Sequence, residues 1–161
     1  MQSFDQLYLF VKESCTNGEP VADKAMTPKG VKIHEGDLKK VCASLREHES
    51  VFFDMLSCIS VVDNGLEAGT LELIYNLYSI PFNHHLALKV MVPRDQAEVD
   101  SVQDIWKTAN WHEREAYDMF GIKFSGHPDL RRILLPADWT GHPLRKDYKH
   151  QEYYRDVKVE Y

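Results

Sequence analysis

The sequence lacks any apolar run approaching the roughly 20 residues that a membrane-spanning helix needs. Its longest apolar stretches, around Val51 to Leu56 and Ile59 to Val62, have the length of strands. The first fifteen residues carry Asp5 and Glu13 and contain no basic stretch followed by an unbroken apolar one, so no secretory signal is expected. These absences predict a cytoplasmic location and only indirect membrane association.

An excess of positive charge is also missing. The chain has 19 Lys and Arg against 25 Asp and Glu, a formal net charge of −6. Phosphate binding requires a cationic surface that releases counterions. Nucleic acid is therefore not an expected partner.

Cysteines are few: Cys15, Cys42 and Cys58 lie far apart and form no C-x-x-C pair. Zinc and iron–sulfur sites in proteins use closely spaced thiolates. We therefore expect no cluster in this chain, and we expect each cysteine to be a small buried apolar residue in a reducing compartment.

Motifs of common active sites are absent too. The sequence has no G-x-S-x-G, Walker A or G-x-G-x-x-G pattern, and His112-Glu113 is followed by Ala116 where a zinc protease has its second His. One alternative stays open, a small metal-dependent enzyme. It would be built on His112, His127 and His142. His127, His142 and His150 could also meet in space, with Asp129 or Asp147, as metal ligands.

What the chain does contain is enough apolar material, 43% of 161 residues, for one folded domain. Helical spacing predicts helices over Ser3 to Cys15, from Asp37 onward, and over Gln96 to Ala109, with Ser3 and Asp37 as caps. Alternating or apolar runs predict four strands: Val31 to His34, Val51 to Asp63, Leu71 to Ile80 and His85 to Val92.

The last of these strands alternates clearly. Leu86, Leu88, Val90 and Val92 would point to one face and Ala87, Lys89 and Met91 to the other. Such alternation is typical of a sheet with one buried face. The predicted fold class is α+β, with a mostly antiparallel sheet of about four strands covered by helices.

Charge divides the chain into two parts. Residues 1–109 contain ten Lys or Arg and sixteen Asp or Glu, whereas residues 110–161 contain nine of each. In the second part Pro128, Pro136 and Pro143 forbid a long helix or a central strand. We therefore expect a globular domain over 1–109 and a short helix with an extended docking arm over 110–161.

The short helix is predicted over Trp111 to Phe120. Asn110 followed by Glu113 is a capping signal, and Gly121 marks the end. With the apolar residues buried, a dense charged cluster remains: Glu113, Arg114, Glu115 and Asp118. This cluster is either part of an interface or a solvated face with weak ion pairs.

Two similar units follow the helix, Gly126-His127-Pro128-Asp129-Leu130-Arg131-Arg132 and Gly141-His142-Pro143-Leu144-Arg145-Lys146. In each unit an extended His-Pro pair precedes a Leu and two cations. A long irregular segment with apolar anchors and Arg is typical of a protein interface, although it could also fold back over its own sheet. The candidate interface residues are Glu113, Arg114, Glu115, Asp118, His127, Leu130, Arg131, Arg132, Trp139, His142, Leu144, Arg145, Lys146 and Asp147.

The same residues carry a family resemblance. Glu113 to Gly121 read EREAYDMFG, residues 126–136 read GHPDLRRILLP, and Asp138-Trp139 precedes GHPLRKDY at 141–148. This closely resembles the signature of the C subunit of respiratory complex I, the NADH:quinone oxidoreductase. A weaker likeness extends through Phe53 to Cys58 and Val62-Asp63.

The resemblance implies a non-catalytic scaffold subunit in the peripheral arm of a proton-translocating complex, peripheral on the cytoplasmic side of the bacterial inner membrane. It implies a hetero-oligomer with complex I subunits D, B and I, without direct membrane insertion. FMN, iron–sulfur clusters and quinone would belong to partner subunits, and none to this chain. Because the chain ends soon after Tyr148, the resemblance implies a separate subunit, not a fusion with the D subunit. Related ferredoxin-, coenzyme- or hydrogenase-linked complexes remain alternatives.

Overall fold

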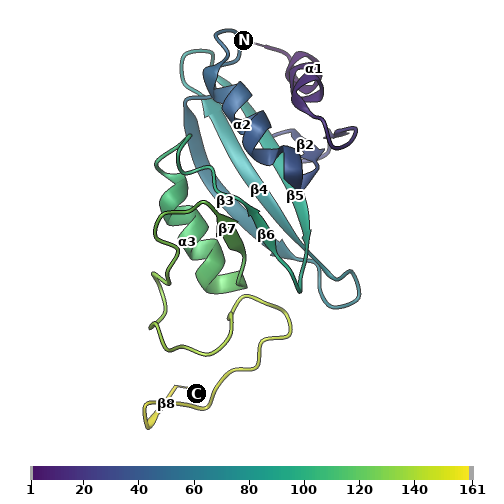
Figure 1. Ribbon diagram of the computed structural model, residues 1–161. Coiled ribbons are helices and arrows are strands. Elements are labelled where there is room, and N and C mark those ends of the chain that lie inside the picture. Colours follow the sequence, from purple (N-terminus) through teal and green to yellow (C-terminus); the bar gives the residue numbers. More distant parts are fainter. Residues whose placement is uncertain (1, 160–161) are drawn as a thin grey trace.

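The computed structural model describes residues 2–159 (Figure 1). The helices are α1 (Phe4–Ser14), α2 (Leu38–Glu47), preceded by a 3-10 turn at Glu35–Asp37, and α3 (Ala109–Phe120). The strands are β1 (Val21–Asp23), β2 (Gly30–Ile33), β3 (Met55–Asp63), β4 (Thr70–Ser79), β5 (His84–Pro93), β6 (Glu98–Asp100), β7 (Lys123–Ser125), β8 (Tyr153–Tyr154) and β9 (Val157–Lys158). Over residues 2–159 no helix has the length and apolar character needed to cross a bilayer.

The central sheet has five strands in the order β1-β2-β5-β4-β3. Strands β3, β4 and β5 form the expected antiparallel meander, and β1 adds a short edge strand that the sequence did not reveal. The pair β2 and β5 is parallel, because the chain leaves β2 through α2 and enters the sheet again at its far edge. The α+β class is confirmed, with a mixed sheet.

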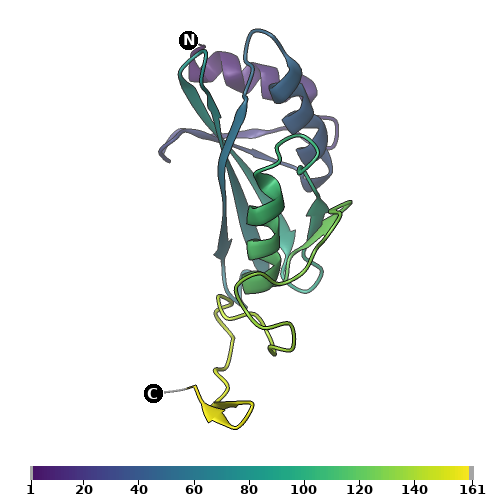
Figure 2. The same ribbon diagram turned by 90° about the vertical axis from the view of Figure 1, so that its left-hand side faces the viewer.

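One face of the sheet carries the helices, as the side view shows (Figure 2). On β4 every second residue points into this core: Leu71, Leu73, Tyr75 and Leu77 are at most 1% exposed. On β5 the residues predicted to share the buried face, from Leu86 to Val92, are buried as expected. Helices α1 and α2 cover one half of the face, and α3 packs beside β3.

The prediction of a helix over Gln96 to Ala109 is wrong. This segment holds strand β6, paired in parallel with β7, followed by turns up to the start of α3. Its apolar residues are nevertheless buried: Val102 is completely buried and Trp106 is 4% exposed. They lie in turns and not on a helix. The turns are fixed from outside: Glu113 accepts from the Val102 amide at 2.8 Å, and the Trp106 indole donates to the Phe53 carbonyl at 3.0 Å.

The predicted helix ends were partly right. Ser3 caps α1 in a reciprocal box with Gln6, and Gly121, with φ +74°, ends α3. Asp37 stands at the start of α2, but its carboxylate accepts from Thr16 and Asn17 and makes no cap bond. Helix α3 begins at Ala109, one residue before the predicted cap Asn110. Glu113 accepts from the Val102 amide and does not complete a capping box.

Candidate functional site

Helix α3 presents its charged residues mainly to the interior. Glu113 and Asp118 are 0% exposed and Arg114 is 8% exposed, whereas Glu115 is exposed. The alternative of a solvated charged face is therefore wrong for three of the four residues. Buried charges require partners, since an unpaired one costs several kcal/mol. Glu113 has its partners before the helix, in Ser101 and Val102. Arg114 and Asp118 have theirs in the residues that follow it.

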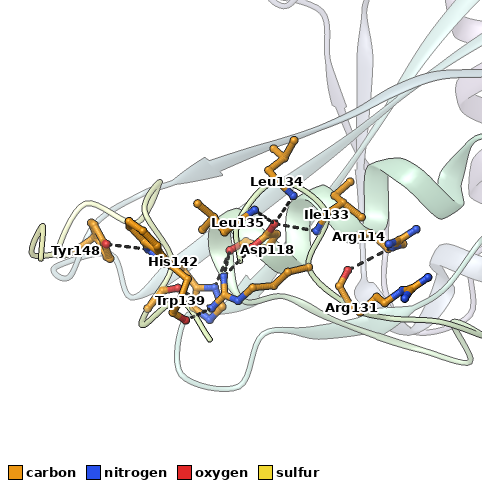
Figure 3. Close-up of polar contacts among 11 residues, drawn as sticks. Arg114, Asp118, Arg131, Ile133, Leu134, Leu135, Trp139, His142 and Tyr148 are labelled. Atoms are coloured by element: carbon orange, nitrogen blue, oxygen red, sulfur yellow. Dashed lines mark hydrogen bonds and ion pairs between the residues drawn. The ribbon is translucent and has the colours of Figure 1, made fainter. Parts of the chain in front are cut away.

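Asp118 organises the first half of the arm (Figure 3). Its Oδ2 accepts from three consecutive backbone amides, those of Ile133, Leu134 and Leu135, at 2.8 to 3.0 Å. Its Oδ1 accepts from the Arg132 guanidinium at 2.7 Å. Burial alone would raise the pKa of Asp118, but the amide of Leu135, the guanidinium and the other amides outweigh it and lower that pKa. One carboxylate thus fixes the course of four residues that have no regular structure.

Each Gly-His-Pro unit attaches the arm to α3. His127 donates from Nε2 to the Asn110 carbonyl at 3.2 Å, at the start of the helix. His142 donates from Nδ1 to the Asp118 carbonyl at 3.0 Å, near its end. The preceding Gly126 and Gly141 have φ of +82° and +81°, so both units begin in the left-handed conformation that favours glycine. The two units thus share the same backbone conformation at glycine, and their histidine side chains bind opposite ends of one helix.

The two cation pairs divide in the same way. Arg132 donates to Asp118 and to the carbonyls of Trp139 and Gly141, whereas Arg131 is exposed and pairs only with Asp129. In the second unit Arg145 donates to the Phe120 and Arg94 carbonyls, whereas Lys146 is exposed. One cation of each pair holds the arm and the other faces outward.

A third anchor joins the arm to the sheet. Arg94 donates to both carboxylate oxygens of Asp63, at 2.9 and 2.7 Å, and to Asp147 at 2.5 Å. The Lys146 amide donates to Asp63 at 2.8 Å. Burial opposes ionisation of Asp63, but the Arg94 guanidinium and the amides outweigh it and lower its pKa to about 2. The pKa of Arg94 is raised by the same two carboxylates.

Large apolar side chains remain exposed around these anchors. Trp111 on α3 is 62% exposed, Leu134 is 62% and Leu144 is 54%. Leu134 and Leu144 donate their amides to the last turn of α3, to Asp118 and to the Met119 carbonyl. Their backbone is therefore fixed while their side chains face outward. Leu130 is partly buried against the core, and the Trp139 indole donates to the Tyr148 hydroxyl at 3.0 Å.

The histidines proposed as metal ligands are occupied separately. His127 and His142 bind opposite ends of α3, and His150 stacks edge-on against Tyr148. Within residues 2–159 no group of three or more His, Cys, Asp or Glu is arranged to hold a metal ion. The arrangement therefore does not favour the metal-enzyme alternative built on His112, His127 and His142.

Sequence reasoning missed Asp63 and Arg94. Asp63 was placed at the end of a strand and Arg94 was not singled out, because their pairing joins positions 31 residues apart, and the Lys146 amide lies 83 residues from Asp63. The only available signal was the Val62-Asp63 likeness. Both residues are 4% exposed. Charged residues are rarely buried to this extent unless they are paired, as these two are with each other.

Comparison with known families gives one match over most of the chain. Residues 31–154 match the family model of the respiratory-chain NADH dehydrogenase 30 kDa subunit. This range includes the sheet from β2 onward, α3 and the whole arm up to β8.

Three curated relatives are named as the C subunit of NADH-quinone oxidoreductase. The protein of Chlorobium phaeobacteroides is 53% identical over 118 residues, which are 73% of this chain and 70% of that protein. The protein of Chloroherpeton thalassium is 52% identical over 118 residues, which cover 48% of that protein. The one of Salinispora arenicola is 38% identical over 149 residues, or 90% of this chain and 61% of its own length. The chain thus spans between 48% and 70% of the length of these relatives.

Solved structures are also similar to this chain, among them these two. The trypsin-resistant fragment (1-134) of Nqo5 is 28% identical with a TM-score of 0.53, over 63% of this chain and 82% of that one. A chain of the membrane-bound sulfane sulfur reductase, an archaeal respiratory membrane complex, has a TM-score of 0.74 at 21% identity, over 90% of this chain and 85% of that one. The second likeness concerns the fold alone.

Proposed function

Because the chain belongs to the family of the respiratory-chain NADH dehydrogenase 30 kDa subunit, which is the C subunit of complex I, we propose that it is a non-catalytic scaffold subunit of the peripheral arm of a proton-translocating NADH:quinone oxidoreductase. Its role is to hold neighbouring subunits in position. The observation that carries the proposal is the arm: its backbone is fixed from within while Leu134, Leu144 and Arg131 face outward.

The chemistry is assigned to partner subunits. The proposed partners are complex I subunits D, B and I, which would hold the quinone site and the iron–sulfur clusters, with FMN elsewhere in the complex. Cys42 is fully buried, and burial raises the pKa of its thiol, so it is a poor metal ligand. The complex would lie on the cytoplasmic side of the bacterial inner membrane, with this chain peripheral to it.

Preorganisation supports docking by this particular segment. An arm ordered before binding loses less conformational entropy on association than a flexible peptide. Exposed apolar residues on a fixed backbone are suited to be anchors that fill pockets of a partner. Arg131, 71% exposed at its side chain, can add a charge-assisted hydrogen bond without disturbing the fold of the arm.

The test is co-purification from native membranes with the double variant Leu134→Glu and Leu144→Glu. Each leucine that would be buried against a partner should weaken the complex, when it is replaced, by about 2 kcal/mol or more, which is roughly thirtyfold in affinity. We expect subunits D, B and I to accompany the wild-type chain and to be lost from the variant. The matched control is Leu9→Glu, since Leu9 is similarly exposed, at 56%, on the far helix α1.

A wild-type chain recovered alone in gentle detergent would contradict the proposal. Equal loss of partners in the Leu9 variant would show that the added charge, and not the arm, is responsible. As a milder change, Arg131→Ala should weaken the assembly by about 1.5 to 3 kcal/mol if its guanidinium binds a partner carboxylate. An unchanged yield of complex on native gels would assign the contact to the leucines alone.

A further inference from the structure

Glu113 is a carboxyl group completely enclosed by the protein, and its hydrogen bonds are to the turn after β6. Its Oε2 lies 2.6 Å from the Ser101 hydroxyl and its Oε1 lies 2.8 Å from the Val102 amide. The His127 Nε2 lies 4.0 Å from Oε2, and both side chains are 0% exposed. The carboxyl therefore joins three segments: α3, the turn after β6, and the first residues of the arm.

The imidazole of His127 has its proton on Nε2. Its Nδ1 accepts from the Asp129 amide at 3.0 Å, so this nitrogen carries no proton. The Nε2–H donates to the Asn110 carbonyl over 3.2 Å, a long hydrogen bond. The same nitrogen faces the Glu113 carboxyl. One donor thus lies between two acceptors.

The surroundings of Glu113 offer no buried cation among the groups that face it. Helix α2 contributes Cys42, which is fully buried, and Lys39, which lies outside and pairs with Asp104 of the turn at 3.0 Å. Strand β4 contributes Tyr75, whose hydroxyl is buried and has no hydrogen-bond partner. Burial outweighs the bonds from Ser101 and Val102 and raises the pKa of Glu113 to about 7.

We propose that Glu113 is a proton-binding site inside the subunit, and that the presence of the proton determines which acceptor holds His127 and how firmly the arm begins. With the proton bound, the acid donates to the Ser101 hydroxyl oxygen, keeps the Val102 amide, and leaves His127 on the Asn110 carbonyl. When the proton leaves to solvent, the carboxylate becomes the stronger acceptor and attracts the Nε2–H of His127.

The consequence reaches the arm because the same ring holds the Asp129 amide. A shift of His127 from Asn110 toward Glu113 moves residues 126–129, the first unit of the arm. The site is independent of the docking proposal, since it concerns the attachment of the arm to its own domain.

The test is a titration of the full chain by NMR, from roughly pH 5 to 9. The Glu113 side-chain carboxyl carbon should titrate with a midpoint near 7. The Nε2–H signal of His127 and the amide signals of residues 126–129 should change with the same midpoint. In Glu113→Gln these changes should vanish, and in the matched control Glu115→Gln, an exposed position on the same helix, they should persist.

A Glu113 carboxyl that titrates at the usual value of about 4.3 would overturn the proposal, and this measurement needs no variant. A His127 signal that changes equally in Glu113→Gln would overturn the coupling. If Glu113→Gln does not fold, His127→Leu, which has no side-chain donor, gives the second test. Loss of the imidazole donor should move the Glu113 midpoint upward, and an unchanged midpoint would contradict the proposed contact.

Discussion

The sheet domain and the arm are stabilised by different interactions. In the domain, a continuous cluster of apolar side chains from α1, α2, α3 and the sheet is buried, and its stabilisation is spread over some thirty residues. The arm is held by a few charged side chains. Asp118, Asp63 and Arg132 bind backbone groups of the arm, and Arg94 binds the Asp147 carboxylate. The difference teaches that a segment without helix or strand can be ordered when charged side chains of a neighbouring domain satisfy its backbone.

The largest effect is expected from Asp118→Ala. The change removes the acceptor of three amides and leaves Arg132, 13% exposed at its side chain, without its charge partner. Breaking one partner of a buried pair costs about 3 to 5 kcal/mol. We expect residues 130–135 to become accessible to proteases and to lose amide protection, while amides of β4 and β5 keep theirs. Loss of protection throughout the sheet would show that the two regions are not separate.

The matched substitution in the domain is Leu88→Ala, at a position that is 0% exposed on β5. Deleting a buried leucine side chain destabilises a protein by about 2 to 5 kcal/mol. Because this loss acts on the shared core, we expect the midpoint of urea unfolding to fall for sheet and arm together. An arm that opened first in this variant would contradict the contrast with Asp118→Ala.

Lowering the pH should loosen the arm before it affects the sheet domain, without any mutation. The pKa of Asp63 is lowered to about 2, so its bonds to the arm are intact above pH 4 and are lost as the pH falls toward 2. The pKa of Asp118 is lowered as well, so its bonds are lost only below the usual range of an aspartate. The Asp63 shift corresponds to about 2 kcal/mol. We expect hydrogen exchange of the arm amides, corrected for intrinsic rate, to increase over this range before that of β4. The conservative variant Asp63→Asn should remove part of this pH dependence.

Gly121→Ala should have a smaller effect. At φ +74° an alanine costs about 1 to 2 kcal/mol, and its Cβ would lie 2.5 Å from the His142 Nε2. The ring must move, so its bond to the Asp118 carbonyl should break and the second unit of the arm should loosen. The His142 imidazole signals report this directly. Gly69→Ala, also at positive φ but with no atom near the new Cβ, is the control for backbone strain alone.

The smallest effect is expected for Asp138→Ala. Asp138 accepts from the Tyr154 hydroxyl and from the Arg155 guanidinium, all on exposed groups at the last hairpin, β8 and β9. Exposed ion pairs contribute little. The hairpin should loosen, seen as smaller amide shift dispersion at 153–158, with no change in the melting temperature of the domain. A lower melting temperature would mean that this hairpin supports the sheet.

The sequence predicted the fold where its periodicity was local. The alternation from Leu86 to Val92 placed β5 correctly, and Gly121 marked the end of α3. The helix over 96–109 failed because Val99, Val102 and Trp106 have helical spacing but are buried from a strand and turns, which Glu113 fixes from another element. Spacing along the chain cannot report a bond of this kind.

The sequence predicted that the arm is an irregular segment, but it did not predict which residues attach the arm to the domain. The two Gly-His-Pro units were interpreted as docking devices in which Leu and cations mattered more than the histidines. In the structure both histidines hold α3, and Arg132 and Arg145 are occupied inside the chain. A sequence pattern shows that a cation is present, but the direction of its side chain depends on distant carbonyls. The docking of the remaining outward residues stays a prediction.

The anchors of the arm also determine an order of folding. The anchor groups that lie outside the arm, from the Asn110 carbonyl to the Asp63 carboxylate, belong to α3 and β3. The arm closes loops of up to 83 residues on bonds that exist only after α3 and the sheet are in place. On a nascent chain the domain can therefore mature while the arm is still unstructured. The order of the arm therefore depends on a domain that has already brought α3 and β3 into place.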